Sequence, residues 1–194
     1  MSEGTEKPLP TRERYTIQDL FDDLRLISPS PSVVYPVGSE IIYPEWNNCV
    51  QSLGENHPVT RGLAQILEFL EHGYEDQLVR GEIHRTSDTP SAVFKTLIKS
   101  IPPEALEYVI TRPSSYVRTL LESVRSERKR EIERYMNIEA GVRQEASSAP
   151  DDPDAQNKLR LLLWILGHYK EASEVFQKAR RLGWDSSKSE LVGL

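Results

Sequence analysis

The stretch LRLLLWILGHYKEASEVFQKARRLGW, residues 159–184, carries the clearest helical pattern in the chain. Before Gly167 the leucines recur three and four positions apart, and after it Ala172, Phe176 and Ala179 share one face of a second helix. A glycine just past the last apolar residue is typical of a helix end. The pattern therefore predicts two helices joined by a tight turn.

The same spacing recurs upstream, from Trp46 onward. The apolar stripes comprise Trp46, Val50 and Leu53; Val59, Leu63, Ile66, Leu67 and Leu70; Val93, Leu97, Ile98 and Ile101; and Val117, Leu120, Leu121, Val124, Ile132, Tyr135 and Met136. Prolines punctuate these stripes without interrupting them. We predict a mainly α fold, a helical bundle with a four-helix core plus short extra helices, over residues 46–184.

Residues 1–45 look irregular, because prolines stand among β-branched residues in LISPSPSVVYPVGSEIIYPEW. Only TIQDLFDDL has helical spacing, with Ile17, Leu20, Phe21 and Leu24 on one face. We predict an N-terminal arm that carries this short helix and an extended piece.

Two further segments break the helical pattern. Residues 72–88 read as a connection that admits a short strand at Leu78 to Ile83. Residues from about 138 to 154 are polar, acidic and rich in small side chains, which predicts a long mobile loop. Asp154 is expected to cap the helix after it, and residues 185–194 form a C-terminal tail.

Composition narrows the class of protein. The chain of 194 residues has a formal charge of −6 and one cysteine, Cys49, so it cannot form an internal disulfide. No run of about 18 apolar residues is present to span a bilayer. These features predict a soluble, intracellular protein without a membrane partner.

Basic charge is concentrated in two predicted helices that flank the acidic loop. Residues 118–134 hold six basic and four acidic side chains, residues 135–154 one and five, and residues 155–184 six and two. Within RSERKRE, the cluster of Arg125, Arg128, Lys129 and Arg130 is suited to neutralising phosphates. A solvated helix face with intrahelical ion pairs explains the same cluster, so both interpretations stay open.

Motifs for catalysis are weak. The chain has no Walker loop, dinucleotide fingerprint, zinc-type spacing or nucleophile elbow. His72, Asp76 and His84 are a poor metal set because Gly73 interrupts the helix that would hold them, and Cys49 reads as a small core residue. We predict that the protein is not an enzyme and uses no metal or cofactor.

Two families resemble residues 154–184. Gly167, Tyr169, Ala172, Phe176, Ala179 and Leu182 stand where a tetratricopeptide hairpin places its packing residues. The chain has no second copy of the period, and a lone repeat cannot bury its own face. This resemblance implies a helical protein-interaction module, an adaptor or complex subunit, whose C-terminal hairpin docks on another chain.

The same stretch also resembles the C-terminus of coat proteins of rod-shaped plant viruses, the tobamovirus-like family. In that family an apolar helix and an aromatic-basic turn precede a short C-terminal pattern. The residues that match this pattern here are Phe176, Gln177, Leu182 and Trp184, and DSS follows them. EWNNCVQSLGENHPVTRGLAQIL resembles the first hairpin of that family, and LLESVRSERKREIER its RNA-binding helix.

The coat resemblance implies a self-assembling subunit that packages RNA through sequence-independent phosphate contacts. Its partners would be copies of itself in an open helical homo-oligomer and the RNA backbone, in the virion and host cytoplasm. The residues implied for RNA are Arg125, Arg128, Lys129, Arg130, Lys158 and Arg160; those for assembly are Trp46, Arg61, Tyr169, Phe176, Leu182 and Trp184. The acidic residues Asp151, Asp152 and Asp154 would repel between subunits and link assembly to pH, or simply form a solvated loop and helix cap.

Overall fold

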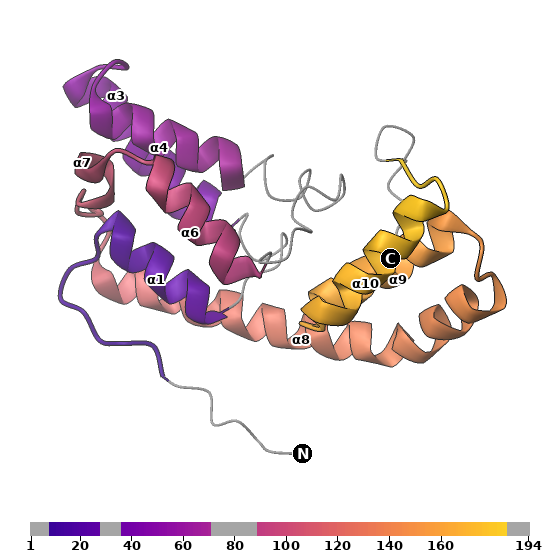
Figure 1. Ribbon diagram of the computed structural model, residues 1–194. Coiled ribbons are helices and arrows are strands. Elements are labelled where there is room, and N and C mark those ends of the chain that lie inside the picture. Colours follow the sequence, from indigo (N-terminus) through magenta and orange to yellow (C-terminus); the bar gives the residue numbers. More distant parts are fainter. Residues whose placement is uncertain (1–7, 28–35, 71–88, 186–194) are drawn as a thin grey trace.

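The computed structural model describes residues 8–27, 36–70 and 89–185, which are mostly helical (Figure 1). The helices are α1 (Ile17–Ile27), the π-helix η1 (Gly38–Ile42), α3 (Tyr43–Leu53), α4 (Pro58–Glu68), α6 (Pro90–Ser100), α7 (Pro103–Leu106), α8 (Ser114–Ser148), α9 (Pro153–Ile165) and α10 (Tyr169–Arg181). The prediction of a mainly α fold is confirmed. The predicted strand at 78–83 and most of the predicted C-terminal tail lie outside the described residues.

The helices gather around two cores, where the sequence predicts one four-helix core. We call described residues 8–124 the N-terminal lobe, which contains α1 to α7 and the first part of α8 around one apolar cluster. Residues 125–185 form the C-terminal lobe, in which α9 and α10 pack on the rest of α8. Figure 1 shows the lobes at opposite ends of α8.

Proline starts many of these helices. A proline occupies the first or second position of α3, α4, α6, α7 and α9. Its fixed φ suits the first turn, where its missing N–H would have no helical partner anyway. At α6 the predicted cap is confirmed, since the Thr89 hydroxyl accepts a hydrogen bond from the backbone N–H of Ala92 at 3.2 Å.

The prediction that residues 1–45 form an N-terminal arm is wrong. The face of α1 forms as expected, with Ile17, Leu20, Phe21 and Leu24 fully buried. That face belongs to the core of the N-terminal lobe, and residues expected to be extended are helical in η1 and α3. Pro44, taken as a sign of irregular structure, stands in the first turn of α3.

Helices α4 and α7 approach closely at Gly62. A Cβ atom added to Gly62 would lie 2.3 Å from the Cβ of Ala105 and 3.3 Å from Cδ of Pro102. Such a distance is well inside van der Waals contact, so a larger residue would force the helices apart. The small side chain at this position lets α7 close the end of the lobe.

Helix α8 joins both lobes. It has 35 residues, which corresponds to a length of about 52 Å. The mobile loop predicted at about 138–154 is wrong, because α8 continues to Ser148. Glutamate, alanine, arginine and glutamine there favour helix despite their polarity, and Arg143 pairs with Glu139 at 2.8 Å one turn away.

The C-terminal hairpin folds back along α8. Val142 and Ala146 of α8 are buried in the same cluster as Leu162 and Leu163 of α9. Asp152, in the short turn after α8, caps α9 by accepting a hydrogen bond from the backbone N–H of Asp154 at 2.9 Å. The cap is therefore Asp152 and not the predicted Asp154, because Pro153 takes the first helical position.

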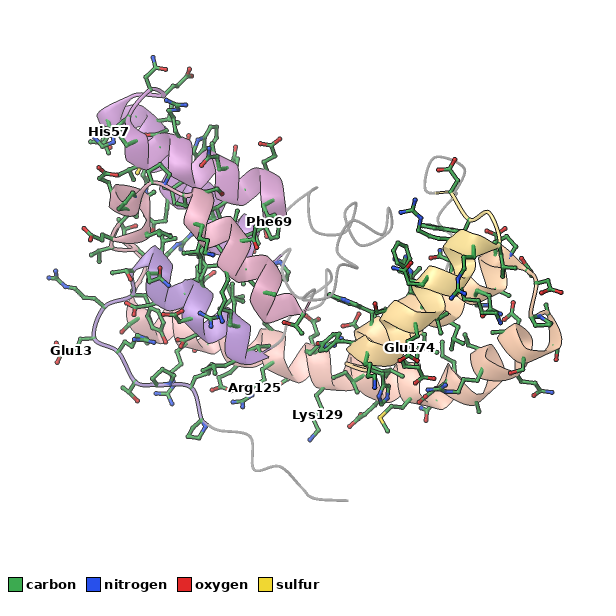
Figure 2. All side chains as sticks on the ribbon, in the orientation of Figure 1. Glu13, His57, Phe69, Arg125, Lys129 and Glu174 are labelled. Carbon is green, nitrogen blue, oxygen red and sulfur yellow. The ribbon has the colours of Figure 1, made fainter. Side chains whose placement is uncertain are left out.

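Two side chains connect the lobes. Phe69, at the end of α4, packs on the apolar clusters of both lobes, and Figure 2 shows it on the side of the N-terminal lobe that faces the C-terminal lobe. Arg128 of α8 is buried and donates a hydrogen bond from Nη2 to the backbone carbonyl of Ile165 at the end of α9. The C-terminal hairpin is thus fastened to α8 next to the junction.

Candidate protein-binding groove

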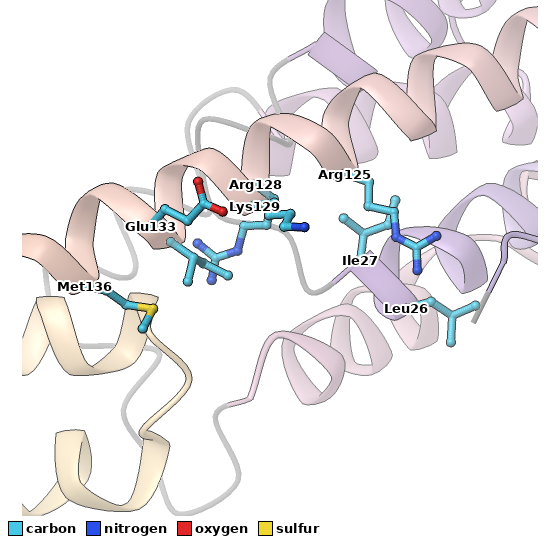
Figure 3. A pocket seen from close by; sticks show the side chains of 8 residues that line it. Leu26, Ile27, Arg125, Arg128, Lys129, Glu133 and Met136 are labelled. Carbon is cyan, nitrogen blue, oxygen red and sulfur yellow. The ribbon is translucent and has the colours of Figure 1, made fainter. Parts of the chain in front are cut away.

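A groove of about 420 Å³ lies at the junction of the two lobes, between the end of α1 and the middle of α8 (Figure 3). We call it the junction groove. Its lining residues are Leu26, Ile27, Arg125, Arg128, Lys129, Ile132, Glu133 and Met136. Figure 3 shows Arg125 near Leu26 and Ile27, and Met136 toward the other end.

Apolar side chains at this groove are unusually exposed. Leu26 and Met136 are each 60% exposed, the largest exposed fraction among the large apolar side chains described. Ile132 lies one turn before Met136 on the same face of α8, so the two form a short apolar ridge. Met136 was predicted to be buried, and that prediction is wrong because the C-terminal hairpin covers a different face of α8.

The charged side chains of the groove differ in how deeply they are buried. The Arg128 side chain is buried, bonded to Ile165 and paired with Glu131 at 3.3 Å. Arg125 is half-buried and Lys129 is exposed, one turn apart on α8. Figure 2 shows both projecting from α8 near the junction. Positive charge therefore stands beside the apolar ridge.

The six basic residues predicted for RNA do not come together. Arg125, Arg128 and Lys129 line the junction groove, and Arg130 is exposed on the same helix. Lys158 lies on α9 and pairs with Glu145 at 2.9 Å. The arrangement gives two separate groups of basic residues instead of one basic surface.

Arg160 departs furthest from its predicted role. Its side chain is 0% exposed, and its guanidinium lies over the rings of Phe176 and Trp184. A nucleic-acid backbone cannot reach it in this conformation. Arg128 differs from Arg160, because it lines the junction groove, is 6% exposed and is bonded to Ile165. Its role in binding RNA stays a prediction.

Three of the six residues predicted for assembly pack against aromatic side chains of the same chain in the C-terminal lobe. Phe176 and Trp184 are buried against each other, with ring centroids 5.9 Å apart. Tyr169 packs edge-on against Trp164 at 5.8 Å, and burial raises the pKa of its hydroxyl. These contacts explain the aromatic pattern without a second subunit.

The remaining assembly candidates are nearer the surface. Trp46 packs partly on the core of the N-terminal lobe and lies 5.7 Å from the Tyr43 ring. Arg61 is exposed and Leu182 is half-buried. Trp46 and Arg61 lie in the N-terminal lobe and Leu182 follows α10 in the C-terminal lobe, so the structure does not join them into one surface.

The acidic residues at the α8–α9 turn are solvated. Asp151, Asp152 and Asp154 are all exposed, and Asp152 serves as the helix cap. The solvated-loop interpretation accounts for their placement. Repulsion between subunits and a link to pH stay predictions.

In the N-terminal lobe, the cysteine side chain that could act as a nucleophile is part of the core. Cys49 is buried, as predicted, and burial raises the pKa of its thiol, which disfavours the reactive thiolate. Among the described residues no three metal-binding side chains cluster, and His72, Asp76 and His84 lie outside those residues. None of the helices described is long and apolar enough to cross a bilayer.

No protein-family model, curated protein or solved structure matches the chain. The resemblances to coat proteins and to tetratricopeptide hairpins therefore stay predictions.

The junction groove itself had only an indirect signal in the sequence. The basic cluster at 125–130 pointed to α8, but the position of Leu26 beside it depends on how α1 packs. That packing joins residues about a hundred positions apart, and periodicity carries no information at such separations.

Proposed function

We propose that this chain is a helical protein-interaction module, and that the junction groove holds an amphipathic, acidic segment of a partner protein. The observation that carries this proposal is the exposure of Leu26 and Met136 in a groove that also presents Arg125 and Lys129. Apolar surface rimmed by charged side chains is characteristic of protein-binding sites.

A helix suits the shape and composition of this groove. Helical segments dock through apolar residues spaced three and four apart, and these would contact Leu26, Ile132 and Met136. Methionine is flexible and polarisable, so Met136 can adapt its packing to the side chain it meets.

The charged side chains of the groove favour a partner segment with acidic residues. Lys129 and Arg125 attract acidic side chains, whereas Glu133 repels them near Met136. We therefore expect the acidic face of the partner to lie beside Arg125 and Lys129, with neutral or basic residues beside Glu133. This arrangement also sets the direction of the docked segment.

The groove is small, and its size sets the expected affinity. A space of about 420 Å³ holds only a few side chains. Interfaces well below standard size are typical of transient complexes, so we expect a roughly micromolar Kd. Such an affinity suits an adaptor or a complex subunit with further contacts.

The proposal is tested by selecting displayed peptides on the full chain and measuring the affinity of the selected peptides by fluorescence anisotropy. Acidic amphipathic helices should be enriched, and scrambled peptides of equal composition should bind at least tenfold more weakly. Met136→Asp and Lys129→Glu should each weaken binding at least tenfold.

The matched controls are Asn137→Asp and Arg134→Glu, which change exposed residues of α8 outside the groove lining. Binding should be unchanged in both. Equal loss in the controls, or equal binding of scrambled peptides, would contradict the proposal. Tight binding of single-stranded RNA with an excess of 260 nm absorbance in the purified protein would favour the RNA-packaging function instead.

A further inference from the structure

Arg160 of α9 is the most anomalous polar residue among those described. Its side chain is fully buried, and no atom of the residues that the structure describes accepts a hydrogen bond from its Nε, Nη1 or Nη2. A guanidinium carries five N–H donors, and buried polar groups in proteins are nearly always hydrogen-bonded. Without a further partner, Arg160 is thus a buried charged group whose N–H donors lack hydrogen-bond acceptors among the described residues.

Two aromatic rings lie next to this group. Its Cζ atom lies 5.3 Å from the ring centroids of both Phe176 and Trp184, and these two rings meet at 68°. Cation–π contacts attract the charge of the guanidinium but supply no oxygen acceptor for its N–H groups. Paired N–H groups of a guanidinium bind two oxygens of one carboxylate side by side.

Two neighbouring residues repeat the anomaly. Asn157, one turn before Arg160 on α9, has a buried Oδ1 atom without a donor. The indole Nε1 of Trp184 is also buried without an acceptor. Burial lowers the pKa of Arg160 to about 9, so the side chain is still charged at neutral pH. Next to the Arg160 guanidinium, the Trp184 indole N–H is therefore a further buried donor without an acceptor among the described residues.

We propose that Arg160 is the anchor of a binding site for a carboxylate group, with Trp184 as the side chain that covers it. One carboxylate neutralises one guanidinium, and its two oxygens match the paired N–H groups of the arginine edge. One carboxylate group brings a single charge into the corner, and the second carboxylate of a ligand such as succinate stays in solvent. A phosphate group would itself bring nearly two negative charges to a corner with one buried cation, since Arg180, which also lies over Phe176, is exposed.

The position of Trp184 allows entry of the ligand. It follows Gly183, whose φ of +92° is a conformation that favours glycine, and it is held by a hydrogen bond from its backbone N–H to the carbonyl of Ala179 at 3.0 Å. Trp184 therefore stands on a turn at the end of α10 and not within a helix. In the proposed site, Trp184 moves at this turn to admit the carboxylate, while Phe176 stays on α10.

This site uses no residue of the junction groove, so the two proposals fail or succeed separately. The test measures the Tm and tryptophan fluorescence of the full chain in sodium succinate, sodium phosphate and sodium chloride at equal ionic strength. Succinate should raise the Tm in a saturable way and shift the fluorescence, while chloride should do neither.

Three variants show whether Arg160 causes the response to succinate. Arg160→Met removes the donors and should abolish the succinate response, and Arg160→Lys keeps the charge without the paired edge and should weaken succinate binding at least tenfold. Arg180→Met is the matched control, because it removes the other arginine on the same ring, and its response should equal that of the wild type.

Peptides distinguish the two sources of a carboxylate. A peptide with a glutamate that binds at least tenfold more tightly than succinate, and loses that binding with glutamine in its place, identifies a protein partner. Equal binding of succinate and the peptide identifies a small carboxylate as the ligand.

The proposal is overturned if Arg160→Met and the wild type respond alike, or if phosphate stabilises more than succinate. Should the Arg160 variants fail to fold, the guanidinium ¹⁵N–¹H spectrum of the wild-type chain decides. Succinate must then shift the slowly exchanging Nε–H signal of the buried arginine, and an unshifted signal overturns the proposal.

Discussion

Two fully buried charged residues, one in each lobe, have opposite surroundings. In the N-terminal lobe, the fully buried Glu45 carboxylate accepts hydrogen bonds from the Tyr108 hydroxyl at 2.9 Å and from the Thr111 backbone N–H at 2.8 Å and hydroxyl at 2.7 Å. In the C-terminal lobe, the equally buried Arg160 has no hydrogen-bond acceptor among the described residues.

Glu45 therefore stabilises the fold, whereas the burial of Arg160 lowers its stability. Glu45 ties α3 to the segment between α7 and α8, because all three donors converge on one carboxylate. Arg160 gains about 2 kcal/mol from cation–π contacts, whereas burial of an unpaired ion costs several kcal/mol. Groups that lower stability in this way are commonly kept for function.

The largest effect is expected for Glu45→Ala. The substitution leaves the Tyr108 and Thr111 donors buried without an acceptor, and should lower the free energy of unfolding by about 3 to 5 kcal/mol. Urea unfolding followed by circular dichroism measures this change. The control is Glu40→Ala, which removes an exposed acceptor of the Tyr116 hydroxyl and should change stability by less than about 0.5 kcal/mol. Equal effects of the two variants would break the comparison between the lobes.

A second test asks whether the N-terminal lobe is also closely packed. Gly62→Ala places a methyl group 2.3 Å from Cβ of Ala105, so α4 and α7 must separate at a cost of about 1 to 3 kcal/mol. The matched control is Gly141→Ala in α8, where no atom lies within 4 Å of the new methyl group. That change should stabilise the chain by about 0.5 to 1 kcal/mol. Equal Tm values for the two variants would show that the α4–α7 contact is loose.

A smaller effect is expected where the C-terminal lobe pairs its charges at the surface. Arg143 of α8 binds both carboxylate oxygens of Glu171 on α10, with Nη2 and Oε2 2.9 Å apart. The Glu171 side chain is 42% exposed, so solvent screening limits the contribution of the pair to about 0.5 to 1 kcal/mol. Glu171→Gln should lose this amount at neutral pH.

The pH dependence of that loss has a defined sign. The hydrogen bonds from Arg143 hold the pKa of Glu171 below its ordinary value of 4.5. The pair therefore stabilises the fold above pH 4.5, and the stabilisation disappears as pH falls through the lowered pKa. Glu174→Gln, an exposed change on the same helix, is the control. A difference between Glu171→Gln and the wild type that persists at low pH would show that the charge is not its source.

The sequence predicted the helices well where their apolar stripes were regular. The stripes of α4 and α10 are confirmed by the burial of Leu63, Ile66, Ala172 and Phe176. Residues 138–148 were missed because their stability as a helix comes from good helix formers and from packing of Val142 and Ala146 on α9. A composition of small polar residues does not distinguish that situation from a loop.

The candidate sites were predictable only in part. The basic run of α8 marked one wall of the junction groove, but Leu26 enters it through tertiary packing. The sequence predicted Arg160 to be a surface cation, because charged residues are rarely buried without a partner. Its burial depends on Phe176 and Trp184 closing over it. A sequence pattern therefore shows which face is apolar, but not which charge that face encloses.

The most direct test of this contrast is the equilibrium unfolding of Arg160→Met in urea, in buffer without carboxylates. Methionine keeps the apolar stem against Phe176 and Trp184 and removes the unpaired charge. We expect a free energy of unfolding equal to that of the wild type or up to about 2 kcal/mol higher. A loss of stability as large as that expected for Glu45→Ala would contradict it, because Arg160 would then be a structural residue and not the unsatisfied half of a binding site.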